Sequence, residues 1–230
     1  MERIATVLLS CLLLTINSGC LDNFFESDEE TTYYDEAGLS KDCIVHDNSY
    51  RCWLILIPEN VANNEKVPLV IDMHGIGGTM YLQHNLTQFA NLSQEHNFLV
   101  AYPQGNDNSW NMADDLCCGD DDDFGFILKM IETIIQRYTV DESRIYSTGW
   151  SNGCGMTQRL VAQASEIFAA GACSSMYFLD EPSPDYSPIP FMEIHGLVDE
   201  LVHYPSVSLV GFYYGAVSYT HLTLPTTRHV

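Results

Sequence analysis

Apolar positions along the chain fall into short continuous runs separated by segments with helical periodicity. Runs of four to six residues rich in branched side chains predict strands, because they suit a sheet that is buried on both faces. Apolar residues spaced three and four apart predict helices with one apolar face. The predicted strands are a hairpin within Cys43–Pro58 and the segments Leu69–Met73, Phe98–Tyr102, Arg144–Thr148, Phe168–Cys173 and Phe191–His195. The predicted helices are Leu86–Glu95, Phe124–Tyr138 and Cys154–Ala164.

Strands alternate with helices along most of the chain, and this order indicates the fold class. Strand–helix–strand units favour parallel strands, with helices on both faces of the sheet. The sequence therefore predicts an α/β protein with a mostly parallel central sheet. Such sheets hold their functional sites at the carboxyl ends of the strands. The turn His74–Gly78, Ser151 and the loop after His195 all follow predicted strands, so we expect them to lie at that edge.

The first residues have the pattern of a targeting sequence. Residues 1–19 are predicted to be a secretory signal peptide, because Arg3 precedes an apolar run that is too short for a comfortable membrane span. A lipoprotein signal ending at Cys20 is a second interpretation. It ranks lower because Asn17 stands where a leucine-like residue is wanted. The sequence thus predicts a secreted, extracellular protein.

Charge divides the remaining chain and excludes some partners. Residues 20–41 are acidic and poor in aliphatic side chains, which predicts a solvated linker, and residues 42–210 carry the predicted α/β domain. The chain has 9 basic and 31 acidic residues, for a formal net charge of −22. This charge disfavours nucleic acid and anionic membrane surfaces as partners. Asn85 and Asn91 each begin an N-x-S/T glycosylation motif, which is relevant to a secreted chain.

Six cysteines in the predicted domain suit an oxidising compartment. Cys43 and Cys52 flank the predicted hairpin and could bridge across it, while the other pairings stay open. We expect no metal site, because Cys117 and Cys118 are adjacent rather than spaced as zinc ligands are. No cofactor is expected either.

The segment Gly149-Trp-Ser151-Asn-Gly153 is a G-x-S-x-G pentapeptide. In α/β-hydrolases this pentapeptide is the nucleophile elbow, a strained and crowded turn that needs glycine on both sides of the serine. The pentapeptide alone fits an ordinary glycine-rich loop equally well. Its position between the predicted strand Arg144–Thr148 and the predicted helix Cys154–Ala164 favours the elbow, with Ser151 as the nucleophile.

Acyl transfer by serine also needs oxyanion donors and an acid that orients the base. The backbone N–H of Asn152 is one predicted donor, because it follows the nucleophile. The N–H of Ile76, in the glycine-rich turn after Met73, is the second. Asp199, just past the predicted strand Phe191–His195, is the predicted acid, and Glu200 is the competing carboxylate.

Seven short motifs occur along the chain in a fixed order. They are His74-Gly-Ile-Gly-Gly, Tyr102-Pro-Gln-Gly, Trp110-Asn, Cys117-Cys-Gly, Asp122-Asp-Phe-Gly-Phe, Arg144-Ile-Tyr followed by Gly-Trp-Ser-Asn-Gly, and His195-Gly-Leu-Val-Asp. Together they resemble the secreted esterases of the polyhydroxybutyrate depolymerase and feruloyl/acetylxylan esterase group, over about residues 42 to 204. The resemblance implies an α/β-hydrolase fold and ester hydrolysis without a metal, with Ser151 as nucleophile and Asp199 as acid.

The histidine of the triad is where this sequence departs from the family. The chain order in these enzymes is serine, acid, histidine, with the histidine after one further helix and strand. After Asp199 the chain offers only three histidines, and the first of them lies in the same loop as the acid. These histidines are His203, His221 and His229.

The last residues are also unusual. From Pro205 to Val230 there is no Asp or Glu, and Ala216–Val230 resembles the translated read-through of a sequencing-library adapter. We therefore expect residues 211–230 to be foreign, with the last helix, strand and histidine of the fold missing. A genuine, divergent terminus with His221 as base is the alternative.

Together these features predict a secreted serine esterase. The expected substrates are feruloyl or acetyl esters of plant polysaccharide such as xylan, or short polyesters such as polyhydroxybutyrate. The chain as given is expected to be inactive or weak. Trp110 and Trp150 could line a sugar or aromatic surface, or could belong to the core or the rim. The alternative function is a non-catalytic, hydrolase-like carbohydrate-binding protein.

Overall fold

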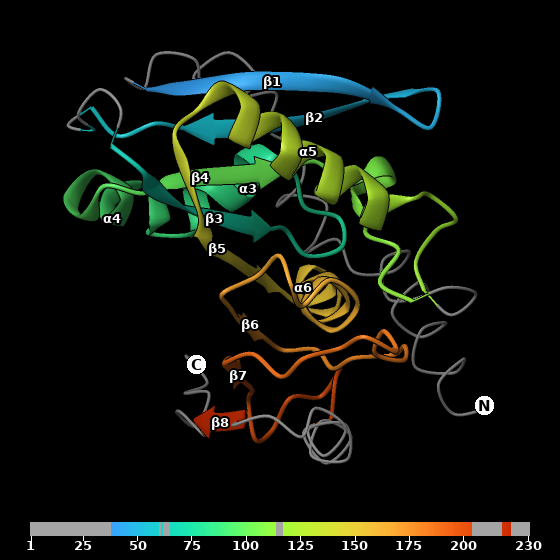
Figure 1. Ribbon diagram of the computed structural model, residues 1–230. Coiled ribbons are helices and arrows are strands. Elements are labelled where there is room, and N and C mark those ends of the chain that lie inside the picture. The colour runs from blue at the N-terminus through green and yellow to red at the C-terminus, as the bar shows by residue number, and fades with distance from the viewer. Residues whose placement is uncertain (1–37, 60, 62–64, 114–116, 204–217, 222–230) are drawn as a thin grey trace, which may run out of the picture.

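The computed structural model describes residues 38–59, 61, 65–113, 117–203 and 218–221. Within these residues, eight strands form one sheet in the order β1-β2-β4-β3-β5-β6-β7-β8, which Figure 1 shows from β1 at the top to β8 at the bottom. All neighbours from β4 to β8 are parallel, so the predicted mostly parallel sheet is confirmed. The strands are β1 (Leu39–His46), β2 (Ser49–Leu56), β3 (Val67–Met73), β4 (Leu99–Pro103), β5 (Val140–Trp150), β6 (Ala170–Ser174), β7 (Phe191–Ile194) and β8 (Ser218–His221).

The predicted hairpin is formed by β1 and β2, which pair in antiparallel fashion at one edge of the sheet. Its turn residues Asp47 and Asn48 have φ values of 46° and 60°, the left-handed pair that a tight two-residue hairpin requires. Cys43 lies directly opposite Cys52, and the two form a disulfide. The bridge predicted across the hairpin is therefore confirmed.

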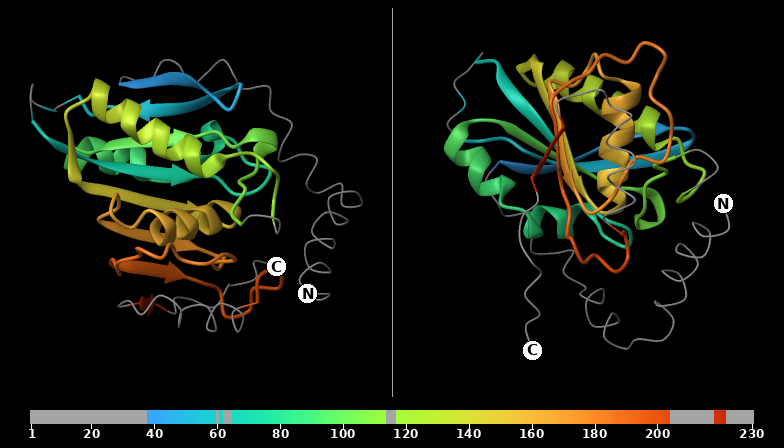
Figure 2. Two further views of the ribbon diagram at one scale, coloured as in Figure 1. Left: turned by 45° about the vertical axis from the view of Figure 1, so that its right-hand side comes forward. Right: turned by 90° about the horizontal axis from the view of Figure 1, so that it is seen from below.

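Alternation of side chains along the central strands explains why the sheet is covered on both faces. In β2, Trp53 and Ile55 join one apolar cluster, whereas Leu54 and Leu56 join the other. Successive residues of a strand point to opposite faces, so one apolar run supplies both cores. Viewed from below, α3 and α4 lie on one side of the sheet and α5 and α6 on the other (Figure 2). The helices are α3 (Met80–Leu86), α4 (Phe89–His96), α5 (Asp123–Arg137) and α6 (Asn152–Gln163).

Helix α5 begins and packs as its pattern predicts. Asp122 caps it by accepting a hydrogen bond from the N–H of Gly125 at 2.8 Å. The neighbouring Asp123 is buried and pairs with the guanidinium of Arg51 from β2. The apolar face of α5 covers the sheet, and its fully buried members are Phe126, Ile127, Met130, Ile131 and Ile134.

The helix predicted at Leu86–Glu95 is α4, and a further helix, α3, precedes it. Helix α3 begins after Thr79, whose hydroxyl accepts the N–H of Leu82, and it ends at Leu86. Helix α4 begins at Phe89. The sequence prediction missed α3 because Gly77 and Gly78 just before it read only as a turn.

Strand β8 lies in the segment that the sequence led us to expect as foreign. Its backbone pairs in parallel with β7, with Met192 opposite Tyr219. A strand therefore occupies the edge where the last strand was expected to be missing, because β7 there offers unpaired N–H and C=O groups. Residues 204–217, between the Asp199 loop and β8, lie outside the described residues, as do residues 1–37 and 222–230.

Candidate active site

The predicted strand, turn and helix around Ser151 are all present. Ser151 lies between β5 and α6 with φ 53° and ψ −121°, a conformation that costs a non-glycine residue about 1–3 kcal/mol. A Cβ on Gly153 would lie 2.5 Å from the carbonyl oxygen of His74, and one on Gly149 would lie 2.6 Å from the carbonyl carbon of Gly153. Both glycines are therefore required by close backbone approach, as the pentapeptide predicts.

The two predicted oxyanion donors lie on turns at the carboxyl ends of β3 and β5. In the His74–Gly78 turn, the N–H of Gly77 donates to Asn108 O at 2.7 Å and that of Gly78 to Gly75 O at 2.9 Å. The N–H groups of Ile76 and Asn152 have no acceptor among the described residues. Asn152 is the first residue of α6, where backbone N–H groups lack an intrahelical partner and attract negative charge. Two backbone N–H groups at this edge of the sheet are thus left without an acceptor among the described residues.

His74 fixes the glycine-rich turn rather than titrating near neutrality. Its Nε2 accepts the N–H of Gly105 at 3.0 Å, so the proton lies on Nδ1, which donates to Gly75 O at 2.8 Å. Burial lowers the pKa of His74 to about 4, because a charged imidazolium would lose its hydration there. The ring is therefore a neutral structural link between the turn and the segment after β4.

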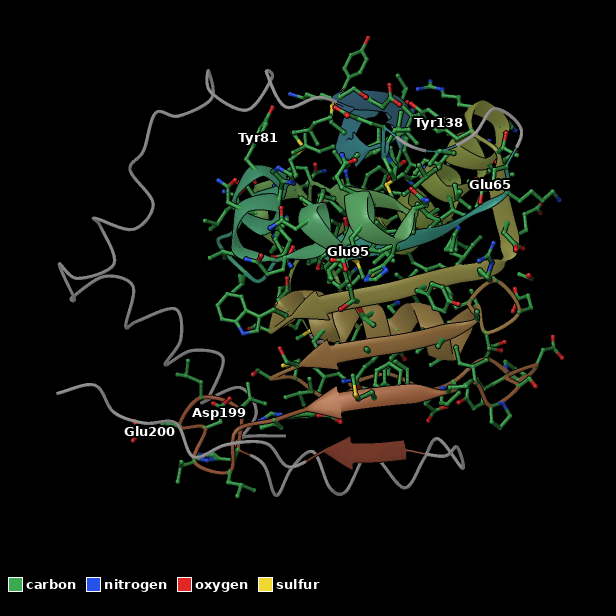
Figure 3. The ribbon with its side chains drawn as sticks, turned by 90° about the vertical axis from the view of Figure 1, so that its left-hand side faces the viewer. Glu65, Tyr81, Glu95, Tyr138, Asp199 and Glu200 are labelled. Carbon is green, nitrogen blue, oxygen red and sulfur yellow. A yellow bond between two sulfur atoms is a disulfide. The ribbon has the colours of Figure 1, made fainter. Side chains whose placement is uncertain are left out.

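Asp199 is held in a defined position after β7. Its Oδ1 accepts the N–H groups of Leu201 and Val202, each at 2.9 Å. Its Oδ2 lies 3.6 Å from Nε2 of His195, which itself bonds Val202 O at 2.7 Å. Glu200 is exposed. Figure 3 shows both carboxylates beyond the tips of the parallel strands. Of the two candidate acids, Asp199 is the one that the loop orients.

Glu193 is a buried carboxyl group that the sequence interpretation missed. It lies in the middle of β7 with 7% of its surface exposed, and its Oε1 is 3.6 Å from Nδ1 of His195. Burial raises the pKa of Glu193 to about 7. Its place at an inward position of a short strand was the only available signal.

Replacing Glu193 with glutamine is expected to stabilise the protein at alkaline pH. The folded state keeps the proton up to about pH 7, whereas the unfolded chain releases it near pH 4.5, so the free energy of unfolding falls as pH rises across this window. The full effect is at most about 3 kcal/mol. In urea unfolding at pH 8, Glu193→Gln should have a larger free energy of unfolding than the parent protein. Most of this difference should vanish at pH 5. Equal stability of variant and parent at pH 8 would contradict this account.

No described histidine bonds the hydroxyl of Ser151. His203 is exposed and makes no hydrogen bond to another described residue. His221 ends β8, with its Cα paired to that of Ile194, but its side chain lies outside the described residues, as does all of His229. The structure thus brings the turns of Ser151 and Ile76 and the Asp199 loop to one edge of the sheet, without assigning the base.

The two tryptophans near the elbow differ in their surroundings. Trp110 is fully buried, with its indole N–H donating to His74 O at 2.8 Å. It therefore does not line a binding surface, because a buried indole with a satisfied N–H belongs to the core. Trp150 is 51% exposed, and its ring lies against Gly75 in the glycine-rich turn.

The remaining predicted features are placed as follows. Asn85 and Asn91 are both exposed, on α3 and α4. Two further disulfides join Cys117 to Cys118 and Cys154 to Cys173, and the second links α6 to β6. No group of three or more His, Cys, Asp or Glu residues in the described part of the chain could hold a metal ion. In the same part, no helix has the length and apolar content needed to cross a membrane.

Comparison with known proteins adds family information to this geometry. The family model Esterase PHB depolymerase matches residues 48–196. A bifunctional acetylxylan esterase/xylanase from Neocallimastix patriciarum is 26% identical over 155 residues, covering 66% of this chain and 22% of that protein. Feruloyl esterase B from Piromyces equi is 28% identical over 160 residues, covering 66% of this chain and 30% of that one. The chain thus spans less than a third of the length of these two relatives.

A solved structure provides the comparison of folds. The acetyl xylan esterase from Aspergillus awamori superposes with a TM-score of 0.59 at 20% identity, covering 72% of this chain and 75% of that one. At this identity the likeness establishes the shared fold, an α/β-hydrolase sheet with its helices.

Proposed function

We propose that this chain, which belongs to the Esterase PHB depolymerase family, is a serine hydrolase of carboxylic esters. The observation that carries the proposal is the backbone at Ser151. A strained serine between two glycines that tolerate no Cβ is what a nucleophile elbow needs. The relatives named as acetylxylan and feruloyl esterases support the same reaction class.

The proposed mechanism proceeds through an acyl-enzyme. A histidine removes the proton of Ser151 Oγ as the oxygen attacks the ester carbonyl, and the carbonyl electrons move onto oxygen. The N–H groups of Ile76 and Asn152 hold that oxyanion. When the C–O bond breaks, the histidine gives its proton to the leaving alcohol. Water then attacks the acyl group in the same way and releases the acid, restoring the Ser151 hydroxyl.

Asp199 has the orienting role in this mechanism. Its Oδ1 is committed to two loop N–H groups, which leaves Oδ2 for the ring N–H of a base. A carboxylate in this position fixes the tautomer of the histidine and stabilises the imidazolium that forms. The histidine itself is not assigned by the described residues.

The surroundings of Ser151 favour an ester with an aromatic or aliphatic acyl group. Large apolar side chains are exposed on the three loops that meet at this edge, and Trp150 directly precedes the nucleophile. The net charge of −22 disfavours a polyanionic substrate. We infer feruloyl or acetyl esters of xylan, or short polyesters, as the substrate class. The exposed apolar residues of these loops are Ile76, Trp150, Leu197, Val198 and Leu201.

Secretion belongs to the same proposal. The disulfides Cys43–Cys52 and Cys154–Cys173 are of the kind that persists in an oxidising compartment. The predicted signal peptide at residues 1–19 and the exposed Asn85 and Asn91 agree with this location. Glycosylation at the two asparagines is proposed on the same grounds.

Ester hydrolysis by the purified natural full-length protein tests the proposed function. We expect turnover of p-nitrophenyl acetate and methyl ferulate, together with covalent labelling of Ser151 by a fluorophosphonate, located by peptide mass spectrometry. An absence of both turnover and labelling would overturn the esterase proposal. Binding to xylan in that case would identify the chain as a non-catalytic carbohydrate-binding protein.

A further inference from the structure

The segment Gly105–Asn111, between β4 and α5, contacts both turns that carry the proposed oxyanion donors. The carbonyl oxygen of Asn108 accepts the N–H of Gly77, the residue after Ile76. The backbone of Trp110 bonds the side chain of Asn152 twice. One segment therefore joins two elements, β3 and α6, that are far apart in sequence.

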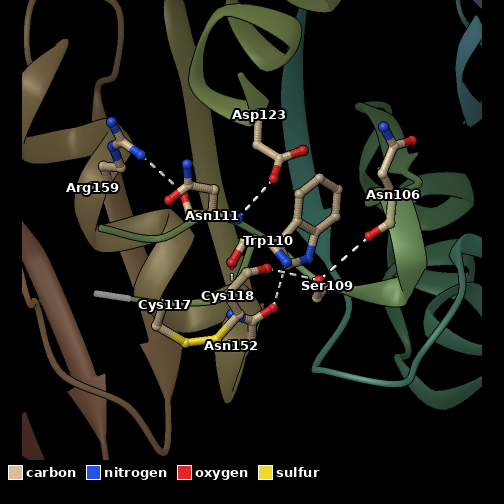
Figure 4. The surroundings of a disulfide bond; sticks show 9 residues. All are labelled: Asn106, Ser109, Trp110, Asn111, Cys117, Cys118, Asp123, Asn152 and Arg159. Atoms are coloured by element: carbon tan, nitrogen blue, oxygen red, sulfur yellow. Dashed lines mark hydrogen bonds between the residues drawn. A yellow bond between two sulfur atoms is a disulfide. The ribbon is translucent and has the colours of Figure 1, made fainter. Parts of the chain in front are cut away.

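Trp110 is hydrogen-bonded to both of these turns. Its backbone N–H donates to Asn152 Oδ1 at 2.7 Å, and its carbonyl accepts from Asn152 Nδ2 at 2.9 Å (Figure 4). Its indole N–H donates to His74 O at 2.8 Å, and the indole lies 4.8 Å from the His74 ring. A single buried residue thus binds the start of the glycine-rich turn through its side chain and the start of α6 through its backbone.

The far side of the segment is also fixed. The N–H of Asn111 donates to Asp123 Oδ2 at 2.7 Å, and Asn111 O accepts from Arg159 at 2.9 Å. Asp123 also pairs with Arg51 in the core. These charged partners hold the backbone of Trp110 against α5 and α6.

We propose that Trp110 is a positioning residue that sets the spacing between the oxyanion donors of Ile76 and Asn152. The inference rests on the proposed esterase function. An oxyanion hole stabilises the transition state only when both donors lie about 2.7–3.1 Å from the position of the oxyanion. The indole N–H holds the carbonyl two residues before Ile76. Without it, the buried carbonyl of His74 loses its partner and the turn can relax away from α6.

The variant Trp110→Phe removes this N–H and keeps an aromatic ring. We expect kcat for p-nitrophenyl acetate to fall about tenfold to a hundredfold, with KM changed less than about twofold, because the lost interaction acts on the transition state. The inhibition constant of phenylboronic acid, which forms a tetrahedral adduct with the serine, should rise by a similar factor.

Trp53→Phe is the matched control. Trp53 is also fully buried, in β2, but its indole N–H has no hydrogen-bond partner among the described residues. Trp53→Phe therefore also removes an indole N–H from the core, but one that is not bonded to either turn. It should lose less thermal stability than Trp110→Phe, because it leaves no buried acceptor unpaired, and it should keep kcat within about twofold.

Amide NMR gives a readout that does not require turnover. Trp110→Phe should shift the amide resonances of Ile76, Gly77 and Asn152, and Trp53→Phe should leave them in place. Equal kcat losses in the two variants, or unshifted amides in Trp110→Phe, would overturn the positioning role. A natural full-length protein without turnover would refute the esterase function, and the amide shifts would still decide whether Trp110 sets this spacing.

Discussion

Replacing Ser151 with alanine is expected to reduce ester turnover by a factor on the order of 10⁴ to 10⁶. The side-chain oxygen is the only atom that forms the proposed acyl bond, and without it only the oxyanion donors and substrate binding remain. Turnover of p-nitrophenyl acetate and fluorophosphonate labelling both measure this loss. An unchanged circular dichroism spectrum would show that the fold is intact.

A second variant separates loss of the nucleophile from relief of backbone strain. Ser151→Gly also lacks the hydroxyl, but glycine adopts φ 53° without the steric cost that serine and alanine bear. We expect it to be as inactive as Ser151→Ala and more stable than that variant by about 1 kcal/mol. Labelling of another serine in either variant would show that Ser151 is not the nucleophile. If Ser151→Gly were less stable than Ser151→Ala, the backbone at Ser151 would not be strained.

Replacing Gly153 with alanine is expected to cost about 3 kcal/mol or more of stability and to abolish turnover. The added Cβ would lie 2.5 Å from His74 O and nearer still to Met73 O, which are backbone atoms of β3 and its turn. Neither can move without displacing the sheet or α6, so Ser151 and Ile76 lose their alignment. Urea unfolding measures the first effect, and p-nitrophenyl acetate hydrolysis measures the second.

Gly196→Ala is the stability control for Gly153→Ala. A Cβ at Gly196 would meet its nearest atom at 3.8 Å, an ordinary van der Waals contact, so its stability should change by less than about 1 kcal/mol. If the two alanine variants were equally stable, the close packing of α6 on the end of β3 would not be what requires glycine at position 153.

The parts of the fold that the sequence predicted are those with a local signal. The strand predicted at Leu69–Met73 and the helix predicted at Phe124–Tyr138 match the bounds of β3 and α5 to within two residues. Boundaries shifted where pairing extended an element, as in β5, which begins at Val140 because that residue pairs with Val67. Helix α3 was missed because its cap, Thr79, follows two glycines.

The candidate site divides in a similar way. Ser151 and its glycines carry a local motif, and the structure supplies the geometry that the motif requires. The bonds between Trp110 and Asn152 join residues 42 positions apart, so no local pattern could reveal them. Glu193 was likewise missed, because its burial depends on the neighbours of β7 in the sheet.

The buried His74 and Glu193 have opposing effects on the response of the fold to pH. The pKa of His74 is lowered to about 4, so the free energy of unfolding rises with pH between 4 and 6.5. The pKa of Glu193 is raised to about 7, and its contribution falls between 4.5 and 7. Asp72, with its pKa raised to about 6 by burial, adds to the fall. Because the windows overlap, His74 offsets only one of the two carboxyl groups, so these three buried groups together make the fold more stable in mildly acidic surroundings than near neutral pH.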